Sequence, residues 1–405
     1  MEDSLGNVVT SASMDAVRAI DAAIDLLGRA WPGSWEAAQR ATQEDPGLAI
    51  GYAVQALMHA SWGRRDEAIK AIVRALDQAG SASARERSVI ELVDHVVRGR
   101  THAGLAWLQA HLRRFPSDRL ALMTGMGAYG LFAFSGLADH NEQRLRLLDQ
   151  VERHYPAGDA WLLAYRGWAR IEAGSVDEGL AMALRAIELQ PRNAHNAHII
   201  AHGFHEAGRF AQWLDFLSTW LPDYPDDALM WGHLQWHAAL AELGLGRDDA
   251  ALHRCLGPIV SYFGRCSPFM GLADVPSLLW RLGLRGFRDL PWARAAQHAS
   301  EYFPNGSNAF GEIHLAMLAA AQRDPDALAS CGKRLERIEA EGYPGARAAL
   351  AWVAALQALL EGRSDDAQRY FQRCEDEAVR LGGSNAQRSV ISATRECQQL
   401  PEACA

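Results

Sequence analysis

Four histidines in one short segment carry the first chemical signal of this sequence. His195, His198, His202 and His205 are spaced by 3, 4 and 3 residues in the stretch AHNAHIIAHGFHEAGRF. In an α-helix, residues three and four positions apart lie on the same face. The sequence therefore predicts a helix face made of imidazole rings.

A second histidine pair follows along the chain. His233 and His237 are four residues apart in the stretch WGHLQWHAAL. Two helical histidines at this spacing have Cβ atoms about 5–6 Å apart, which suits two ligands of one metal ion. One interpretation is a divalent metal site, for example for Zn, with four imidazoles or with water in place of one of them. Its predicted ligands are His198, His202, His233 and His237.

Three interpretations of these histidines remain open from the sequence. Buried histidines on an inner helix often hydrogen-bond to backbone or carboxylate groups and stack on tryptophan, and tryptophans flank both segments. A pocket for a ligand other than a metal is the second interpretation, and the metal site is the third. The spacing indicates a polar site more firmly than it indicates what binds there.

The elements that must position these histidines form a repeat of helix pairs. In the segment GWARIEAGSVDEGLAMALRAIELQP, residues 167–191, two amphipathic stretches flank a turn at Gly174 and Ser175, and Pro191 ends the second stretch. This organisation fits the 34-residue tetratricopeptide pattern of helix, turn and helix. We found no run of alternating β-branched residues that would indicate strands.

The same turn recurs along the chain at glycines spaced by one repeat or a multiple of it. Degenerate units near Asp139, Phe287 and Gln322 fill the longer gaps. The turn glycines are Gly63, Gly99, Gly174, Gly208, Gly246 and Gly362, and the prolines that follow 17 residues after a turn are Pro116, Pro156, Pro191, Pro225 and Pro304.

We therefore predict an all-α, tetratricopeptide-like, right-handed superhelical solenoid of about nine helix pairs. It would form a single domain over residues 1–405, with residues 257–276 as an irregular segment between repeats, because this segment contains three prolines and three glycines. In such repeats the first helix of each pair lines the concave groove. The repeat register places His195, His198, His202, His205 and His233 toward this groove and His237 nearer the seam between helices.

Composition excludes several classes of partner. The chain has 40 Lys and Arg residues against 49 Asp and Glu residues, a formal charge of −9, which argues against nucleic-acid binding. Lys70 and Lys333 are its only lysines, so a lysine-rich membrane-docking patch is not expected. The N-terminus lacks a signal-peptide pattern, no apolar stretch is long enough to span a membrane, and the six cysteines contain no Cys-x-x-Cys pair. We predict a soluble cytoplasmic protein.

Several blocks of the sequence resemble the tetratricopeptide repeat protein 38 family. The blocks are AHIIAHGFHEAGRF, HLQWHAAL, ADVPSLLWRLGLRG and FGEIHLAMLAAA. His195 and His205 fall outside the family pattern, and MTGMGAYGLFAFSGLAD departs from the family's second repeat. The resemblance implies a helical-repeat fold and a shared polar site. The residues that match the family pattern are His198, His202, His233, Trp236, His237, Asp274, Trp280, Arg281, Glu312 and His314.

Two functional hypotheses follow. The first is a small organic ligand in a His- and Trp-rich pocket, with the protein acting as a hydrolase or lyase through histidine acid–base chemistry or metal-activated water. Its catalytic residues would be His202, His237, His314 and Asp274, with Asp274 orienting a histidine. Its ligand-binding residues would be His195, His198, His205, His233, Trp236, Trp168, Trp280, Arg281 and Glu312.

The second hypothesis is a non-catalytic scaffold that binds a protein or peptide in its concave groove. Tetratricopeptide grooves often hold a peptide carboxylate with lysine, arginine and asparagine. The central groove predicted here contains no lysine. This weakens the carboxylate-binding version of the hypothesis but leaves arginine-based versions open.

Overall fold

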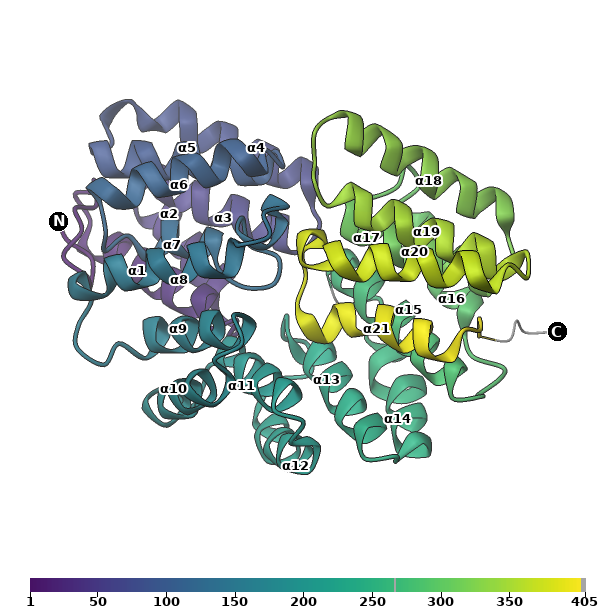
Figure 1. Cartoon of the computed structure of the whole chain (residues 1–405). Coiled ribbons are helices and arrows are strands. Elements are labelled where there is room, and N and C mark those ends of the chain that lie inside the picture. Colours follow the sequence, from purple (N-terminus) through teal and green to yellow (C-terminus); the bar gives the residue numbers. More distant parts are fainter. Residues whose placement is uncertain (266, 402–405) are drawn as a thin grey trace. The chain divides into compact units, whose positions relative to one another are not determined.

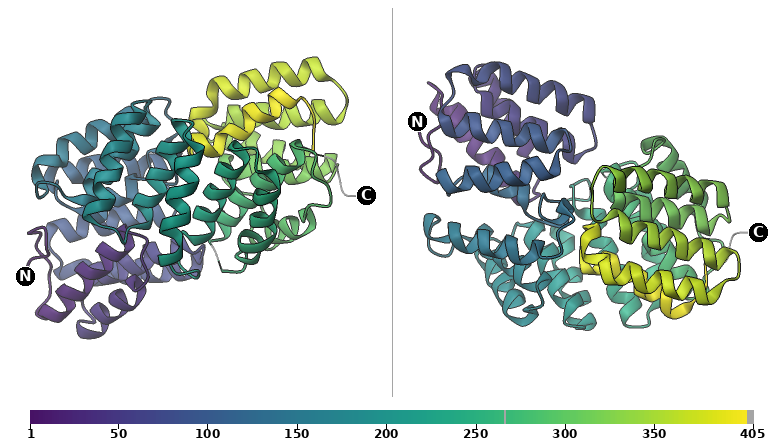
Figure 2. Two further views of the ribbon diagram at one scale, coloured as in Figure 1. Left: turned by 90° about the horizontal axis from the view of Figure 1, so that it is seen from below. Right: turned by 45° about the horizontal axis from the view of Figure 1, so that its top comes forward.

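The computed structural model describes residues 1–265 and 267–401, and the polypeptide is helical along its length (Figure 1). Figure 2 shows the same helices in two further orientations. Within these residues there is no β-strand, and the extended pairing is one isolated bridge between Glu2 and Val8. The all-α prediction is confirmed. No helix in the described residues is long and apolar enough to cross a membrane.

The packing of the helices divides the chain into two compact units. The first unit comprises residues 1–132, 141–203 and 223–230. Its helices are α1 Met14–Gly28, α2 Ser34–Glu44, α3 Ala49–Ser61, α4 Arg65–Gln78, α5 Ala84–Val97, α6 Thr101–Arg114, α7 Arg119–Gly125, α9 Ala160–Glu172, α10 Val176–Leu189 and most of α8 His140–Val151 and of α11 Ala194–Glu206.

The second unit comprises residues 133–140, 204–222 and the chain from residue 231 onward. Its helices are α12 Phe210–Trp220, α13 Trp231–Gly244, α14 Asp248–Arg254, α15 Pro268–Leu284, α16 Trp292–Tyr302, α17 Ala309–Ala321, α18 Pro325–Ala340, α19 Ala346–Leu360, α20 Ser364–Glu377 and α21 Asn385–Cys397. The prediction of a single domain over residues 1–405 stays a prediction.

The turn between the helices of a pair has the same conformation throughout. The six predicted turn glycines all have a positive φ, between 64° and 94°. After Gly174, the Ser175 N–H donates to the carbonyl oxygen of Arg170. A glycine in the left-handed region commonly ends a helix in this way, and Gly174 ends α9. The same five-residue hydrogen bond closes the turns at Gly63, Gly99, Gly208, Gly246 and Gly362.

Two of the three predicted degenerate units have this turn as well. Gly286 occupies the left-handed position with φ 87°, and Phe287 donates to the carbonyl oxygen of Leu282. Arg323 occupies the same position with φ 56°, and Asp324 donates to the carbonyl oxygen of Ala319. The third unit, near Asp139, differs because glycines interrupt the chain between α7 and α8, where a short 3-10 helix, Ala133–Ser135, stands instead.

Small residues allow the helices of a pair to pack closely. A Cβ atom added to Gly167 on α9 would lie 2.7 Å from the carbonyl oxygen of Gly179 on α10, so glycine is required for this approach. Successive helices such as α3 with α4 and α19 with α20 also pack as pairs, and first helices contact the next first helix within a unit, as α3 contacts α5 and α17 contacts α19. A tetratricopeptide-like helical repeat therefore positions the predicted site residues.

The segment predicted to be irregular, residues 257–276, is largely helical at both ends. A π-helix spans Cys255–Ile259 and contains Pro258. Helix α15 then begins at Pro268. Proline is well tolerated there, because the first turn of a helix needs no backbone N–H. The helix continues through Pro276. Cys266 lies outside the described residues.

Candidate metal centre

Helix α11 carries the first histidine pair. His198 and His202 are four residues apart and buried, with exposed fractions of 7% and 0%. Their Nε2 atoms are 2.8 Å apart, so one ring donates a hydrogen bond to the other. The four-residue spacing therefore places the two Nε2 atoms in contact on one face of α11.

Helix α9 supplies an aromatic and an acidic neighbour to this pair. The indole ring of Trp168 stacks on His198 and meets His202 edge-on, with ring centroids 5.9 Å and 4.7 Å apart. Glu172, the last residue of α9, places Oε1 3.7 Å from His202 Nδ1. The carboxylate therefore lies on the side of the His202 ring opposite the nitrogen that faces His198.

Helix α13 carries the second pair, His233 and His237. Residues 232–243 are all buried, as expected for a helix that is covered on every face. The two imidazole rings are nearly perpendicular, at 85°, with centroids 4.8 Å apart. Trp213 on α12 meets the His237 ring at a centroid distance of 5.7 Å.

A hydrogen bond from α15 fixes the orientation of His233. Its Nδ1–H donates to Asp274 Oδ2 at 2.8 Å, so Nε2 is the nitrogen that a metal would take. Trp236 stacks on the His233 ring at an interplanar angle of 10°, and its Nε1–H donates to Ser277 Oγ, which in turn donates to the Asp274 carbonyl oxygen. Asp274 therefore holds the His233 ring through this hydrogen bond, and the catalytic role predicted for Asp274 stays a prediction.

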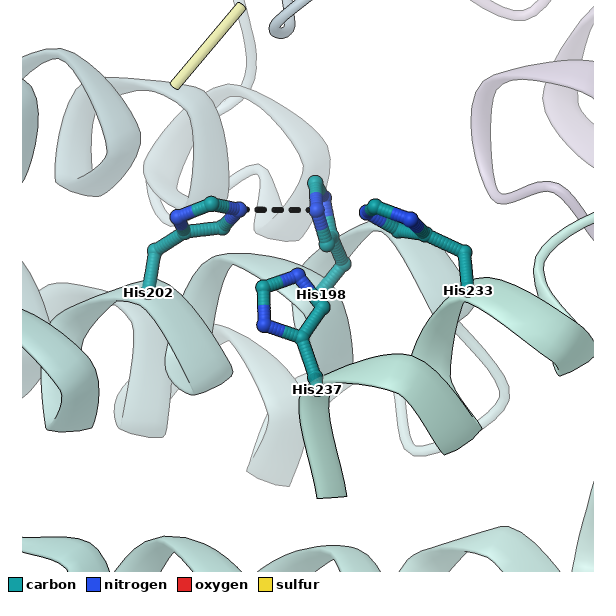
Figure 3. A group of neighbouring side chains, drawn as sticks. All are labelled: His198, His202, His233 and His237. Atoms are coloured by element: carbon teal, nitrogen blue, oxygen red, sulfur yellow. Dashed lines mark hydrogen bonds between the residues drawn. The ribbon is translucent and has the colours of Figure 1, made fainter. Parts of the chain in front are cut away.

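The four histidines of the two pairs form one group. Each offers a ring nitrogen, and these four atoms all lie within 4.8 Å of one another. Figure 3 shows the imidazoles of His198, His202, His233 and His237 turned toward one another, with the hydrogen bond between His202 and His198 drawn as a dashed line. All four side chains are buried.

The nitrogen spacing is compatible with a metal after small side-chain movements. Tetrahedral Zn–N bonds of 2.0–2.1 Å put two ligand nitrogens about 3.3 Å apart. The observed separations, from the 2.8 Å hydrogen bond to the 4.8 Å limit of the group, bracket this value. Neutral imidazoles bring no charge, whereas the carboxylates of Glu172 and Asp274 could balance a divalent ion.

The other histidines of α11 lie outside this group. His195 is partly exposed, with the ring of Tyr165 6.2 Å away. His205 is also partly exposed and hydrogen-bonds through Nδ1 to Glu206 Oε1 at 3.0 Å. Both were predicted as ligand-binding residues from the 3-4-3 spacing, and that role stays a prediction.

Trp280 and Arg281 on α15 contact α21. The Trp280 indole N–H donates to Thr394 Oγ1 at 2.8 Å. Arg281 donates to the carbonyl oxygens of Ser277 and Ala386, and burial lowers its pKa to about 9. These hydrogen bonds give the buried polar groups of Trp280 and Arg281 partners, and they join α15 to α21.

Glu312 and His314 on α17 have separate partners. Glu312 accepts two hydrogen bonds from Arg334, both at 2.9 Å, and one from the Ser307 N–H. His314 Nδ1–H donates to the Phe310 carbonyl oxygen, and burial lowers the pKa of His314 to about 4. His314 is therefore neutral at pH 7, and the catalytic role predicted for it stays a prediction.

Sequence reasoning missed Glu172. The signal was present, because Glu172 lies four residues after Trp168, on the same face of α9, and directly before the turn at Gly174. The position of the turn at Gly174 would have indicated Glu172 as a residue near the histidines.

Comparison with known proteins adds the following findings. No family model matches the chain. It is similar to a tetratricopeptide repeat protein from Parabacteroides merdae, with 15% identity over 76% of this chain and 98% of that chain and a TM-score of 0.36. It is also similar to a human IFIT1 dimer with PPP-AAAA, with 13% identity over 91% of this chain and 96% of that chain and a TM-score of 0.36. The resemblance to the tetratricopeptide repeat protein 38 family stays a prediction.

Proposed function

We propose that this helical-repeat protein binds one divalent transition-metal ion, such as Zn, through His198, His202, His233 and His237. The observation that carries the proposal is the convergence of four buried imidazoles, each offering a nitrogen within 4.8 Å of the others. Imidazole nitrogen is a common ligand of Zn, and a buried set of four matches its tetrahedral preference.

The carboxylates behind the histidines support a metal rather than a purely structural histidine cluster. Metal-binding histidines usually donate their second ring N–H to a carboxylate or carbonyl oxygen. His233 does so to Asp274 at 2.8 Å, and Glu172 lies 3.7 Å from His202 Nδ1. Two carboxylates and one divalent ion would leave the buried group without net charge, which lowers the cost of burying each of them.

The same site could also support chemistry. With four imidazole ligands a Zn ion is closed to substrate, whereas with three it keeps a position for water and lowers the pKa of that water. His198 is the most exposed of the four, at 7%, and is the ligand that we expect to leave most easily. A hydrolase or lyase activity would then depend on this exchange.

Metal titration of the full-length protein tests the proposal. After treatment with a chelator, we expect one Co²⁺ per chain, visible ligand-field bands of a tetrahedral ion, and displacement of Co²⁺ by Zn²⁺. His198→Ala combined with His237→Ala should weaken Zn²⁺ binding by more than about 100-fold, because it removes two ligands rather than an outer hydrogen-bond partner.

A matched control keeps this result interpretable. His102 and His154 are exposed histidines, so the double variant His102→Ala with His154→Ala removes two imidazoles at the surface. It should bind Co²⁺ as the wild type does, and circular dichroism should show equal helicity for both double variants. Equal Co²⁺ affinity in the two double variants, or the absence of stoichiometric binding in the wild type, would contradict the proposal.

A further inference from the structure

Two residues of α13 and two residues of α15 form a closed ring of contacts that includes His233. His233 and Trp236 are three residues apart on α13. Asp274 and Ser277 are three residues apart on α15, and residues at this spacing lie on one face of a helix. His233 contacts Asp274 through Nδ1, and Trp236 contacts Ser277 through Nε1. All four residues are at most 4% exposed.

The hydrogen bond to Asp274 does not by itself fix the plane of the His233 ring. The χ2 torsion of histidine is broad, and a hydrogen bond stays favourable over a range of angles at the donor. The ring can therefore tilt while this bond is kept. Tilting changes the direction in which the lone pair of His233 Nε2 points.

The indole ring of Trp236 restricts this freedom. It stacks on His233 at an interplanar angle of 10° and a centroid distance of 5.4 Å. Its own position is fixed, because Nε1–H donates to Ser277 Oγ at 3.2 Å and Ser277 Oγ donates to the Asp274 carbonyl oxygen at 3.0 Å. The carboxylate therefore holds one edge of the imidazole, and the indole holds its face.

Two other tryptophans beside the histidines lack such a restraint. Trp168 stacks on His198 less evenly, at 26° and 5.9 Å. The indole N–H groups of Trp168 and Trp213 are buried and have no hydrogen-bond partner within residues 1–265 and 267–401. Packing of an indole in this protein therefore does not by itself account for the hydroxyl group that Ser277 offers to Trp236.

We infer that Trp236 and Ser277 are positioning residues of the metal centre, which fix the plane of the His233 ring so that its Nε2 points in one direction before the ion binds. The inference rests on the proposed metal binding, because these residues act on the metal through His233. Outer partners of a metal-bound histidine contribute about 10–100-fold in metal affinity. Ser277 acts through Trp236, so its loss should cost about 10-fold, the lower end of this range.

Two matched variants of the full-length protein test this role. Ser277→Ala removes the hydroxyl group that accepts from Trp236. Thr394→Val removes a hydroxyl group of the same kind, because Thr394 Oγ1 accepts from the Trp280 indole at 2.8 Å and donates to the Val390 carbonyl oxygen. Both hydroxyl groups belong to buried residues, so urea denaturation should show similar losses of stability.

The position of the His233 ring is measured without metal. We would record NMR spectra of the chelator-treated protein with isotope-labelled histidine and identify the His233 signal by its loss in His233→Gln. The stacked indole shifts the ring C–H protons of His233 upfield. This shift should shrink in Ser277→Ala and should stay unchanged in Thr394→Val.

Competition of Zn²⁺ with bound Co²⁺ measures the effect on metal affinity. Ser277→Ala should weaken Zn²⁺ binding by about 10-fold and shift the ligand-field bands of Co²⁺, whereas Thr394→Val should bind both ions as the wild type does. Trp236→Phe combined with Ser277→Ala should lose no more affinity than Trp236→Phe alone, because both changes remove the same hydrogen bond.

The outcomes separate this inference from the metal proposal. An unchanged His233 shift in Ser277→Ala, or an equal loss of Zn²⁺ affinity in Ser277→Ala and Thr394→Val, would overturn the positioning role while metal binding stands. Absence of Co²⁺ binding in the wild type would overturn both.

Discussion

The protein contains two buried histidine–aspartate pairs that differ in how completely their polar atoms are used. In the first unit, His111 Nε2 lies 3.3 Å from Asp118 Oδ2, and His111 Nδ1 hydrogen-bonds to Ser88 Oγ at 2.9 Å. Asp118 also accepts from Arg85 and, through Oδ1, from the Ala121 N–H at the start of α7. In this pair every side-chain polar atom has a partner.

In the second unit, the carboxylate of the pair of His233 and Asp274 has fewer hydrogen-bond and ion-pair partners. Asp274 accepts one hydrogen bond from His233, its Oδ1 has no partner, and it forms no ion pair with arginine or lysine among the residues that the structure describes. The comparison teaches that burial of a histidine–carboxylate pair does not by itself indicate function. We propose that polar capacity left unused around such a pair does.

The largest expected effect in this comparison comes from Arg85→Ala. Arg85 is 6% exposed and its Nη1 lies 2.7 Å from Asp118 Oδ2. Removing it leaves the Asp118 charge buried without a cation, and we expect the free energy of unfolding to fall by about 3–5 kcal/mol. Urea denaturation measures this loss. Arg18→Ala, in an ion pair that is about three-quarters exposed, should change stability by less than about 1 kcal/mol.

Acid should weaken the first pair next. Burial alone would raise the pKa of Asp118, but the charge of Arg85 and the hydrogen bond from His111 lower it to about 2. A carboxyl pKa that is lower in the folded than in the unfolded chain stabilises the protein above about pH 4, and this contribution is lost as the pH falls toward 2.

We therefore expect the difference in unfolding free energy between the wild type and Asp118→Asn to shrink by about 2 kcal/mol between pH 4 and pH 2. Denaturant titrations at several pH values measure it. A difference that stays constant over this range would show that Asp118 does not carry the acid sensitivity.

Asp274→Asn should change the affinity for Zn²⁺ rather than the free energy of unfolding, and this distinguishes the second pair from the first. The amide cannot hold the His233 ring as the carboxylate does, and loss of such an outer partner weakens metal binding by about 10–100-fold. Isothermal titration with Zn²⁺ measures the change. Asp118→Asn should leave the Zn²⁺ affinity unchanged, and an equal loss in both variants would remove the distinction between the pairs.

The smallest effect should come from Ser88→Ala. Ser88 is partly exposed, and its hydroxyl group donates to His111 Nδ1 if Nε2 carries the proton that Asp118 accepts. Loss of one neutral hydrogen bond should cost about 0.5–1.5 kcal/mol, measured by thermal or urea unfolding. A cost as large as that of Arg85→Ala would mean that the hydrogen bond from Ser88, rather than the ion pair, holds this region together.

Much of the fold follows from local sequence pattern. The turn glycines and the terminating prolines correctly predicted where helices end, because a left-handed residue and a missing N–H act within a few residues of their position. The region around Asp139 was harder, since several glycines remove the apolar periodicity there and the chain forms turns and a 3-10 helix instead.

The sequence by itself determined the two histidine pairs, because residues four apart on one helix must share a face. Tertiary structure decided which nitrogens face one another and which carboxylates stand behind them. Glu172 lies 30 residues from His202, and Asp274 lies 41 residues from His233. Such contacts depend on how helices pack rather than on spacing along one helix. For the same reason, the sequence did not distinguish the pair of His111 and Asp118 from the pair of His233 and Asp274.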